Sequence, residues 1–430
     1  MTIFINTAIA ISSLFYLYFL LNVILVNHYR EPAKLVNKGK QRYHLFIVIP
    51  VLNEEQVIGR TITRLSRELA KLPSSIQANI VAVDDNSSDR SLACLTQLKS
   101  PYLQIIHRAG NEKAGKGAVL NTAVNYIHRT LAATEDPQKI VLGVLDADAF
   151  MTGAGLTRAV AHFETDPELT MLQTGVSIYN QTNWLTRMQN FEFMGANNAT
   201  QQLRNRLGQG IASGNGQFVR LDLALNNPWG DSLLEDLEFT LRTWLNGGKT
   251  AFDHKLVVAQ EGVEKIRPFF KQRVRWCQGS LQCIRYLPAL WRSPSLNKFQ
   301  KIDTSVWVLM PFTGCVMPVA GLVALIVLIS RSLTEWHVGW HHLAIITIIC
   351  ITLVVIVLSA NLYLRNYAEI NQPASPISAL LQSLSFQGYL LIVSLTPYVA
   401  IYRQVRGQTG WTKTHHGTRQ PVGIPVKQSQ

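Results

Sequence analysis

The chain has little cysteine, and its cysteines form no recognisable motif. Five are present among 430 residues, and no two of them have the Cys-x-x-Cys spacing of a zinc or redox site. A disulfide framework and a structural zinc site are therefore excluded as the basis of the fold. We expect all five to be reduced and structural, as is typical of a cytosolic compartment. They are Cys94, Cys277, Cys283, Cys315 and Cys350.

Acidic residues are also scarce. Asp and Glu number 27 against 40 Lys and Arg, which gives a formal net charge of +13. The basic residues form no Lys/Arg-rich run, and this argues against nucleic acid as a partner. Many of them lie beside apolar segments, as the cationic flanks of membrane helices do. The charge balance therefore favours membrane lipids and a phosphorylated substrate as partners.

Long apolar runs, by contrast, are plentiful, and the first covers residues 3–26. It is long enough to span a bilayer. A cleaved signal peptide is the alternative, but the run is too long and lacks both a basic N-terminal region and a small-residue cleavage site. We therefore predict a transmembrane helix over residues 1–28. The basic residues after it place the N-terminus outside the plasma membrane and the following domain in the cytoplasm. These residues are Arg30, Lys34, Lys38, Lys40 and Arg42.

Three further apolar runs lie near the C-terminus, at residues 305–329, 343–362 and 377–402. They could be buried core helices of a soluble protein. Their length and near absence of charge favour membrane-spanning helices instead. We therefore predict a multi-pass membrane protein with C-terminal transmembrane segments over residues 304–403.

A basic tail at residues 404–430 restricts how these segments cross the membrane. Three full crossings would place the tail outside, whereas its basic residues favour the cytoplasm. The run at 377–402 is interrupted by polar residues and by Pro397, so it is the one that we expect to be re-entrant or interfacial. We predict a cytoplasmic tail. The basic residues at this end are Arg403, Arg406, Lys413 and Arg419.

Residues 43–264 alternate short β-rich runs with longer helical ones. This alternation predicts an α/β domain with a parallel sheet covered on both faces. Ligands of such sheets lie beyond the carboxyl ends of the strands. Acidic clusters follow two of the expected strands, so we place a ligand site at that edge. The strands are expected at 44–50, 80–83, 103–106 and 140–145, and helices at 53–72 and 114–127.

Asp146 and Asp148 flank one alanine directly after an apolar strand. In a turn, both carboxylates can converge on one cation. Oxygen ligands without His or Cys suit Mg²⁺ or Mn²⁺ held jointly by the protein and substrate phosphates. A solvated turn is the alternative interpretation.

Asp84 and Asp85 end the preceding strand, where a carboxylate can accept hydrogen bonds from a uracil NH or from ribose hydroxyls. The alternative is an Asx-rich turn that caps a helix beginning near Ser91. Lys116 lies between two glycines before a helix, so its ammonium and nearby backbone NH groups could meet a pyrophosphate.

Glu235 and Asp236 are expected at the start of a helix. There they could simply complement the helix dipole. The functional alternative is a general base that takes a proton from an attacking hydroxyl. Adjacent carboxylates point in different directions, and we favour Asp236 as the base.

Residues 265–303 interleave aromatic and basic side chains, as an amphipathic helix in the membrane interface does. This segment contains Gln-Arg-Val-Arg-Trp at residues 272–276. Arg275 offers a planar cationic fork and Trp276 a flat stacking surface, both of which suit a phosphorylated sugar. Headgroup contacts and snorkelling are the alternative for both side chains.

Taken together and in order, the motifs resemble the membrane-integrated branch of family 2 glycosyltransferases with the GT-A fold. That branch includes cellulose, hyaluronan, chitin and poly-N-acetylglucosamine synthases. The resemblance covers roughly residues 43–280. Its pieces are residues 50–54, 83–89, 115–121, 146–148, 213–216, 235–236 and 272–276.

The resemblance implies a UDP-sugar donor and an inverting single displacement. It implies Asp236 as the catalytic base and Asp148 as the ligand of Mg²⁺ or Mn²⁺. Residues 173–179 are expected to help choose the sugar. The implied donor-binding residues are Pro50, Glu54, Asp84, Asp85, Lys116, Asp146 and Asp148. The implied residues at the acceptor and diphosphate end are Asn215, Glu235, Gln272, Arg275 and Trp276.

Three functions are open at this point. The first is processive elongation of a surface or extracellular polysaccharide, favoured by the motif at 272–276 because the resemblance ties it to processive enzymes. The second is single transfer of a sugar to a lipid acceptor. The third is a non-catalytic membrane scaffold or transport subunit, which the acidic motifs argue against. The membrane part is small, so export of a polymer predicts an accessory subunit or a second copy of the chain.

Overall fold

The computed structural model describes residues 41–108, 110, 115–334, 339–369 and 374–408, together with residues 7, 10, 17, 20, 21 and 23–28. Most of the predicted N-terminal helix lies outside these residues. So do Arg30, Lys34, Lys38 and Lys40, and so do Lys413 and Arg419 of the tail.

One seven-stranded sheet organises the domain, with the strand order β3-β2-β1-β4-β6-β5-β7. The four predicted strands correspond to β1–β4, and the α/β class is confirmed. The strands are β1 (Tyr43–Val51), β2 (Ile76–Asp84), β3 (Leu103–His107), β4 (Ile140–Val144), β5 (Leu169–Ile178), β6 (Gln217–Arg220) and β7 (Lys249–Gln260).

The expectation of a wholly parallel sheet is wrong, because β6 runs antiparallel to both β4 and β5. Its first residue, Gln217, pairs with Val144 at the end of β4. The residues just before β6 must therefore lie beside the residues just after β4. This pairing brings the loop at 213–216 against the turn that holds Asp146 and Asp148, although about 70 residues of chain separate them.

Helices cover both faces of the sheet. Leu45 and Ile47 of β1 pack with α2 and α5 on one face, whereas Phe46 and Val48 pack with α4 and α8 on the other. Successive strand residues point to opposite faces, so a strand buried on both sides is apolar throughout. The helices in this part are α2 (Ile58–Leu69), α3 (Ser91–Gln97), α4 (Lys116–Tyr126), η1 (Ile127–Leu131), η2 (Pro137–Lys139), α5 (Gly153–Thr165), α8 (Leu221–Asn226) and α9 (Glu235–Leu245).

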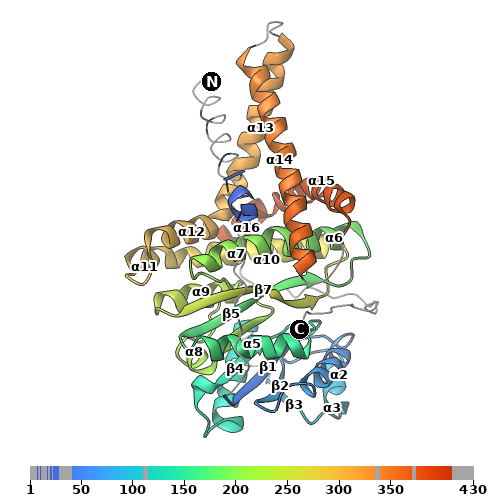
Figure 1. Ribbon diagram of the computed structural model, residues 1–430, viewed down its shortest axis with the longest axis vertical. Coiled ribbons are helices and arrows are strands. Elements are labelled where there is room, and N and C mark those ends of the chain that lie inside the picture. Colours follow the sequence, from blue (N-terminus) through green and yellow to red (C-terminus); the bar gives the residue numbers. More distant parts are fainter. Residues whose placement is uncertain are drawn as a thin grey trace.

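A second helical layer lies between the sheet and the apolar helices (Figure 1). The predicted amphipathic segment begins with α10, which contacts α9 on one side and α16 on the other. Sandwiched in this way, α10 is more enclosed than a helix resting on a bilayer surface. The layer comprises α6 (Trp184–Phe191), η3 (Glu192–Asn197), α7 (Asn198–Arg206), α10 (Ile266–Cys283), η4 (Ile284–Tyr286), α11 (Leu287–Arg292) and α12 (Lys298–Val308).

Three stretches among the described residues are long and apolar enough to cross a membrane, namely Met310–Thr334, Trp340–Ala368 and Pro376–Val405. Figure 1 shows α13 (Met310–Thr334) and α14 (Trp340–Glu369) extending away from the sheet domain. Tyr363 and Asn366 near the end of α14 are buried against the domain, where they bond to Asn190 and to the Met194 carbonyl.

The third stretch is two helices rather than one. It divides into α15 (Pro376–Val393) and α16 (Thr396–Val405), with Pro397 in the first turn of α16. In Figure 1 both lie across the base of α13 and α14, and they contact α6 and α10 respectively. The expected re-entrant or interfacial placement of this stretch stays a prediction. The side of the tail stays a prediction.

Candidate functional site

The predicted acidic and basic motifs meet at the carboxyl edge of the sheet, and Lys116 joins them. Helix α4 begins at Lys116, whose Nζ donates to Asp146 Oδ1 at 2.5 Å and to the Gly214 carbonyl at 2.6 Å. One ammonium therefore connects the turn after β4 to the loop before β6.

Asp236 lies in the first turn of α9, beside Gly214. A Cβ atom at Gly214 would lie 3.1 Å from Asp236 Oδ2 and 3.5 Å from Lys116 Nζ, so the three residues are adjacent. Asp236 Oδ1 accepts a hydrogen bond from the Leu237 NH at 2.8 Å. Oδ2 is the oxygen that faces the cluster.

The electrostatics of Asp236 suit a proton acceptor. Its side chain is only 6% exposed. Burial, followed by the charge of Glu235, raises the pKa of Asp236 to about 7, while Lys116 and Arg275 oppose this rise. A base with a pKa near the working pH is efficient because it is both free to accept a proton and strong enough to hold it.

Lys116 keeps its positive charge in this setting. Burial lowers the pKa of Lys116, but Asp146, Glu235 and Asp236 outweigh burial and hold it above its usual value. A half-buried cation surrounded by carboxylates at a helix N-terminus is a favourable partner for an incoming diphosphate.

Asp146 and Asp148 occupy a turn directly after β4, but their environments differ. The Asp146 side chain is 39% exposed, whereas Asp148 is buried and its Oδ2 accepts from the Glu261 NH at 2.9 Å. Among the residues that the structure describes, no group of three His, Cys, Asp or Glu side chains could hold a metal ion. The donor set therefore fits a divalent cation only if substrate oxygens complete its coordination, as Mg²⁺ and Mn²⁺ sites at phosphates commonly allow.

Asp84 and Asp85 both acquire partners that the sequence did not point to. Asp84 is fully buried, with Oδ2 lying 2.8 Å from His107 Nδ1 and accepting from the Ser87 NH at 3.3 Å. Asp85 forms an ion pair with Arg108. Burial raises the pKa of Asp85, and Arg108 counteracts this effect. The contacts of Asp84 are thus with neighbouring residues of the domain, and Asp85 is the carboxylate that is more available to a ligand.

His107 and Arg108 were missed because they carry no motif. Their position could nevertheless have been predicted. His107 ends the third predicted strand and Arg108 follows it, at the same sheet edge as Asp84 and Asp85. Parallel neighbours place their carboxyl ends together, so any polar residue directly after a strand of this sheet is a candidate.

Pro50 lies in β1, and Glu54 lies in the turn that follows it. The Glu54 NH donates to Ser91 Oγ at 2.6 Å, and Asn53 Oδ1 accepts from the Ser88 NH at 2.7 Å. These bonds tie the loop after β1 to the loop after β2. The Asx-turn interpretation applies to Asp89, which accepts from the Ser91 NH at 2.9 Å.

Asn215 and Gln173 shape the loop before β6. Asn215 Oδ1 accepts from the Asp146 NH at 3.2 Å, and its Nδ2 donates to Gln260 Oε1 at 2.7 Å. Gln173 donates to the Asn215 carbonyl at 2.8 Å and accepts from the Ser213 NH at 3.0 Å. Both side chains therefore position the backbone around Gly214.

Of the motif at 272–276, Arg275 is the residue most directly joined to the acidic cluster. Its Nη1 donates to the Leu233 carbonyl at 3.2 Å, two residues before Glu235, and its charge acts on Asp236. Trp276 packs edge-on against Phe193, with ring centroids 6.4 Å apart. Gln272 is half-buried on α10, and the contacts found among the described residues do not join it to the cluster.

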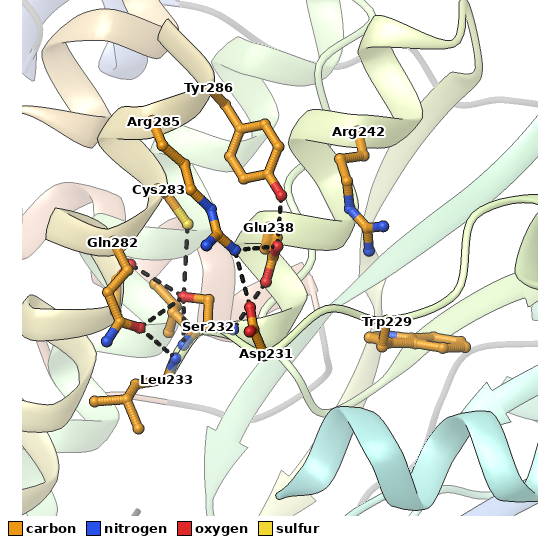
Figure 2. A network of polar contacts seen from close by, with 12 residues as sticks. Trp229, Asp231, Ser232, Leu233, Glu238, Arg242, Gln282, Cys283, Arg285 and Tyr286 are labelled. Carbon is orange, nitrogen blue, oxygen red and sulfur yellow. Dashed lines mark hydrogen bonds and ion pairs between the residues drawn. The ribbon is translucent and has the colours of Figure 1, made fainter. Parts of the chain in front are cut away.

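A polar network beside the site fixes α9 to η4 and the loop before α9 to α10 (Figure 2). Glu238 is buried and accepts from Arg285 Nη2 at 2.6 Å, from the Tyr286 hydroxyl at 2.5 Å and from the Ser232 NH at 2.9 Å. Gln282 Oε1 accepts from the Leu233 NH at 2.8 Å. The loop that leads into Asp236 is thereby held from both helices, and neither Glu238 nor Arg285 was singled out from the sequence.

Comparison with known protein families identifies the family to which the chain belongs. The model for "Glycosyl transferase family group 2" matches residues 141–363, which is more than half of the chain, and that for "Glycosyl transferase family 2" matches residues 46–224. The chain belongs to glycosyl transferase family 2. This family 2 enzyme is a glycosyltransferase with the GT-A fold.

Its curated relatives include proteins named for a lipid product. It is 28% identical over 383 residues to a beta-monoglucosyldiacylglycerol synthase of Trichormus variabilis, covering 86% of this chain and 76% of the relative. It is 32% identical over 274 residues to one of Synechocystis sp., covering 62% of this chain and 54% of that relative. It is also 26% identical to a probable glucomannan 4-beta-mannosyltransferase of Arabidopsis thaliana, over 57% of this chain and 46% of the relative.

A solved structure shares the fold of the family 2 enzyme. It is the mannosyltransferase PcManGT from Pyrobaculum calidifontis in complex with GDP-Man and Mn²⁺, with a TM-score of 0.59 and 13% sequence identity. The match covers 94% of this chain and 98% of that one. The likeness therefore extends over the sheet domain and the apolar helices together.

Proposed function

We propose that this enzyme is a membrane-bound inverting glucosyltransferase that transfers one glucose from a UDP-sugar to diacylglycerol. The observation that carries the proposal is the position of Asp236, a buried carboxylate with a pKa of about 7 that faces Lys116 across Gly214. Asp236 would then act as a proton acceptor beside a cationic site for a diphosphate, in a chain that also has helices of membrane length.

In this mechanism the acceptor hydroxyl gives its proton to Asp236 Oδ2 as its oxygen attacks the anomeric carbon of the sugar. The new carbon–oxygen bond forms on the face opposite the diphosphate. The old bond breaks with its electron pair passing to the leaving UDP, which inverts the configuration at that carbon. Lys116 and Arg275 stabilise the charge that develops on the leaving group.

Asp85 and its partner Arg108 lie where the nucleoside would bind, at the end of β2. Asp148, with Asp146 beside it, would hold a divalent cation together with the diphosphate oxygens. Such a cation supplies Lewis-acid stabilisation of the leaving phosphate. Trp276 would stack on the acceptor.

The lipid acceptor is favoured over polymer elongation, which reverses the order that the sequence motif alone favoured. The support is the names of the two relatives above, which specify glucose and diacylglycerol. Processive polysaccharide synthesis is the second candidate, and the glucomannan relative supports it. Of the three stretches of membrane length that the structure describes, only α13 and α14 extend from the domain. Two such helices are few for the wall of a polymer channel.

We further propose that the sheet domain faces the cytoplasm and that α13 and α14 form a hairpin through the plasma membrane. Helices α15 and α16 then lie in the cytoplasmic interface, where Arg403 and Arg406 of α16 and its C-cap meet the headgroups. The chain then crosses the membrane only twice after the sheet domain. The basic tail therefore returns to the cytoplasm, which is the side that its charge favours.

The test uses the full-length protein in purified membranes or lipid nanodiscs. A panel of UDP-sugars and GDP-mannose is supplied with Mg²⁺ or Mn²⁺ and diacylglycerol, and the lipid products are analysed by mass. We expect one hexose per lipid at every donor concentration, with UDP-glucose preferred. A ladder of products that lengthens with donor would establish the processive candidate instead. Transfer to no lipid and to no glycan would overturn the proposal.

A further inference from the structure

Arg273, the second residue of the motif at 272–276, is enclosed in a way that its neighbours are not. Only 7% of its surface is exposed. Its guanidinium makes a two-pronged ion pair with Glu192, with Nη1 donating to Oε1 at 2.8 Å and Nη2 donating to Oε2 at 2.7 Å. Burial lowers the pKa of Arg273, but Glu192 outweighs this effect and raises it, so Arg273 keeps its positive charge.

Glu192 connects this arginine to a helix at the membrane. It opens the π-helical segment η3, and its Oε2 also accepts from the Tyr389 hydroxyl at 2.6 Å. Tyr389 belongs to α15 and is buried, while Leu384 and Leu391 of the same helix are exposed. One carboxylate therefore joins α10 to a helix whose outer face is apolar. Single π-turns inside helices are frequent at functional sites.

Arg273 also occupies one face of Trp276. Its Cζ lies 4.4 Å from the centroid of the indole, one helical turn away on α10. Phe193, the residue after Glu192, contacts the same indole edge-on. The η3 segment thus holds Trp276 twice, through Phe193 directly and through Glu192 and Arg273. An acceptor can stack only on the opposite face of the indole.

We propose that Arg273 is a positioning residue that presents the opposite face of Trp276 to the acceptor and couples it, through Glu192 and Tyr389, to helix α15. The identity of the acceptor rests on the proposed function; the coupling does not. A buried ion pair that served folding alone would affect stability without selecting the acceptor step. The coupling predicts instead that weakening this triad changes how the acceptor is used while the donor is bound as before.

Two conservative variants test this in the full-length protein in nanodiscs. Tyr389→Phe removes only the hydroxyl, and Glu192→Gln removes the charge but keeps the shape. Tyr363→Phe is the matched control, since Tyr363 lies in the same buried cluster and its hydroxyl bonds Asn190 rather than Glu192. Diacylglycerol is titrated at saturating UDP-glucose, and UDP release is measured with and without the lipid.

We expect both variants to raise the acceptor KM roughly tenfold and to increase UDP release relative to lipid product, with the donor KM unchanged. Arg273→Lys should show the larger effect, because an ammonium cannot make the two-pronged contact. An unchanged acceptor KM and unchanged product ratio in folded Tyr389→Phe and Glu192→Gln proteins would overturn the proposal. So would an equal change in Tyr363→Phe.

A spectroscopic measurement separates this inference from the proposed function. Protein labelled with 5-fluorotryptophan gives a ¹⁹F resonance for Trp276, which the Trp276→Phe variant identifies. We expect this resonance to shift in Tyr389→Phe and Glu192→Gln and to stay in place in Tyr363→Phe. If the wild type glucosylates no lipid, the proposed function fails, and this resonance alone decides the positioning role. An unmoved resonance would reject it.

Discussion

Lys116 Nζ and Asp146 Oδ1 lie 2.5 Å apart, although 30 positions separate the two residues in the chain. The contact joins the start of α4 to the turn after β4, and the same ammonium reaches the carbonyl of Gly214. The contact places one positive charge among Asp146, Glu235 and Asp236. Lys116 therefore links Asp146, which is assigned to donor binding, with Asp236, which is assigned as the base for the acceptor hydroxyl.

Removing the charge of Lys116 should weaken donor binding and raise the pKa of Asp236 further. We expect Lys116→Gln to lower kcat/KM for the donor about 100-fold, which corresponds to the loss of a strong charge-assisted contact of about 2.7 kcal/mol. Steady-state kinetics of UDP release measure it. Lys71→Gln is the control, since Lys71 is exposed and pairs with Glu68 on the surface. Equal activity of the two variants would contradict the assignment of Lys116.

The pH dependence of transfer should report Asp236. Because only the ionised carboxylate accepts a proton, activity should rise as pH rises through about 7, the raised pKa of Asp236. Lys116 lowers that pKa, so its removal should move the rise to higher pH. Asp236→Asn should lower kcat by about 10²- to 10⁴-fold and abolish this limb. A rate profile that keeps its rise near pH 7 in Asp236→Asn would assign the base elsewhere.

Gly214 and Gly208 form a matched pair for separating strain from function. Their φ angles are +74° and +70°, so alanine strains both backbones alike, by about 1 kcal/mol. A Cβ at Gly208 meets nothing within 4 Å, whereas one at Gly214 meets Asp236 and Lys116. We expect similar losses of thermal stability in both variants and loss of transfer only in Gly214→Ala. Full activity in folded Gly214→Ala would show that the space beside Asp236 is not used.

Asp253 should set the acid limit of stability. Burial raises its pKa, but hydrogen bonds and ion pairs with His162 and Arg158 outweigh burial and hold the pKa well below its usual range. Its contribution is therefore present above the unfolded pKa of about 4 and is lost as pH falls toward the lower folded pKa.

We expect Asp253→Asn to cost roughly 3 kcal/mol at neutral pH, because it leaves Arg158 and His162 without their carboxylate partner. Thermal unfolding at pH 7 and pH 4 measures both effects, and the gap between variant and wild type should narrow at the lower pH. Asp166→Asn, whose ion pair with Lys249 is on the surface, should cost less than about 1 kcal/mol. A gap that stays constant with pH would contradict the linkage.

The side of the C-terminal tail can be tested by labelling. In a background without the native cysteines, a cysteine at position 413 should react with a maleimide only after the cells are opened. This is the expected result if α15 and α16 lie in the cytoplasmic interface. Labelling of intact cells by a membrane-impermeant reagent would mean that the third apolar stretch crosses the membrane.

Several local features were predictable from residue patterns alone. The apolar run before Pro50 forms β1, and Asp146 and Asp148 lie in a turn after β4, because a strand buried on both faces must be apolar and its polar successors must leave the core. The start of α9 at Glu235 followed from the acidic residues in its first turn. Each of these depends on neighbours within a few positions.

Contacts between distant segments were not predictable in this way. The antiparallel pairing of β6, the ion pair of Asp85 with Arg108 and the enclosure of Arg273 by Glu192 and Tyr389 each join residues that no spacing relates. The polar residues and Pro397 led us to expect that the third apolar stretch is re-entrant or interfacial. Its division into α15 and α16 and their positions beside α6 and α10 were not predicted.

The sequence by itself determined the class of the domain, the edge of the sheet where the acidic motifs gather and the presence of membrane-length helices, because strand and helix periodicity and apolar length are local properties of a chain. Tertiary structure alone decided which charges meet. It placed Lys116 between Asp146 and Asp236, turned Arg273 inward to Glu192 and left Asp236 in a site dry enough to raise its pKa. Coulombic and desolvation effects depend on distance in space rather than along the chain, and only the folded molecule sets that distance.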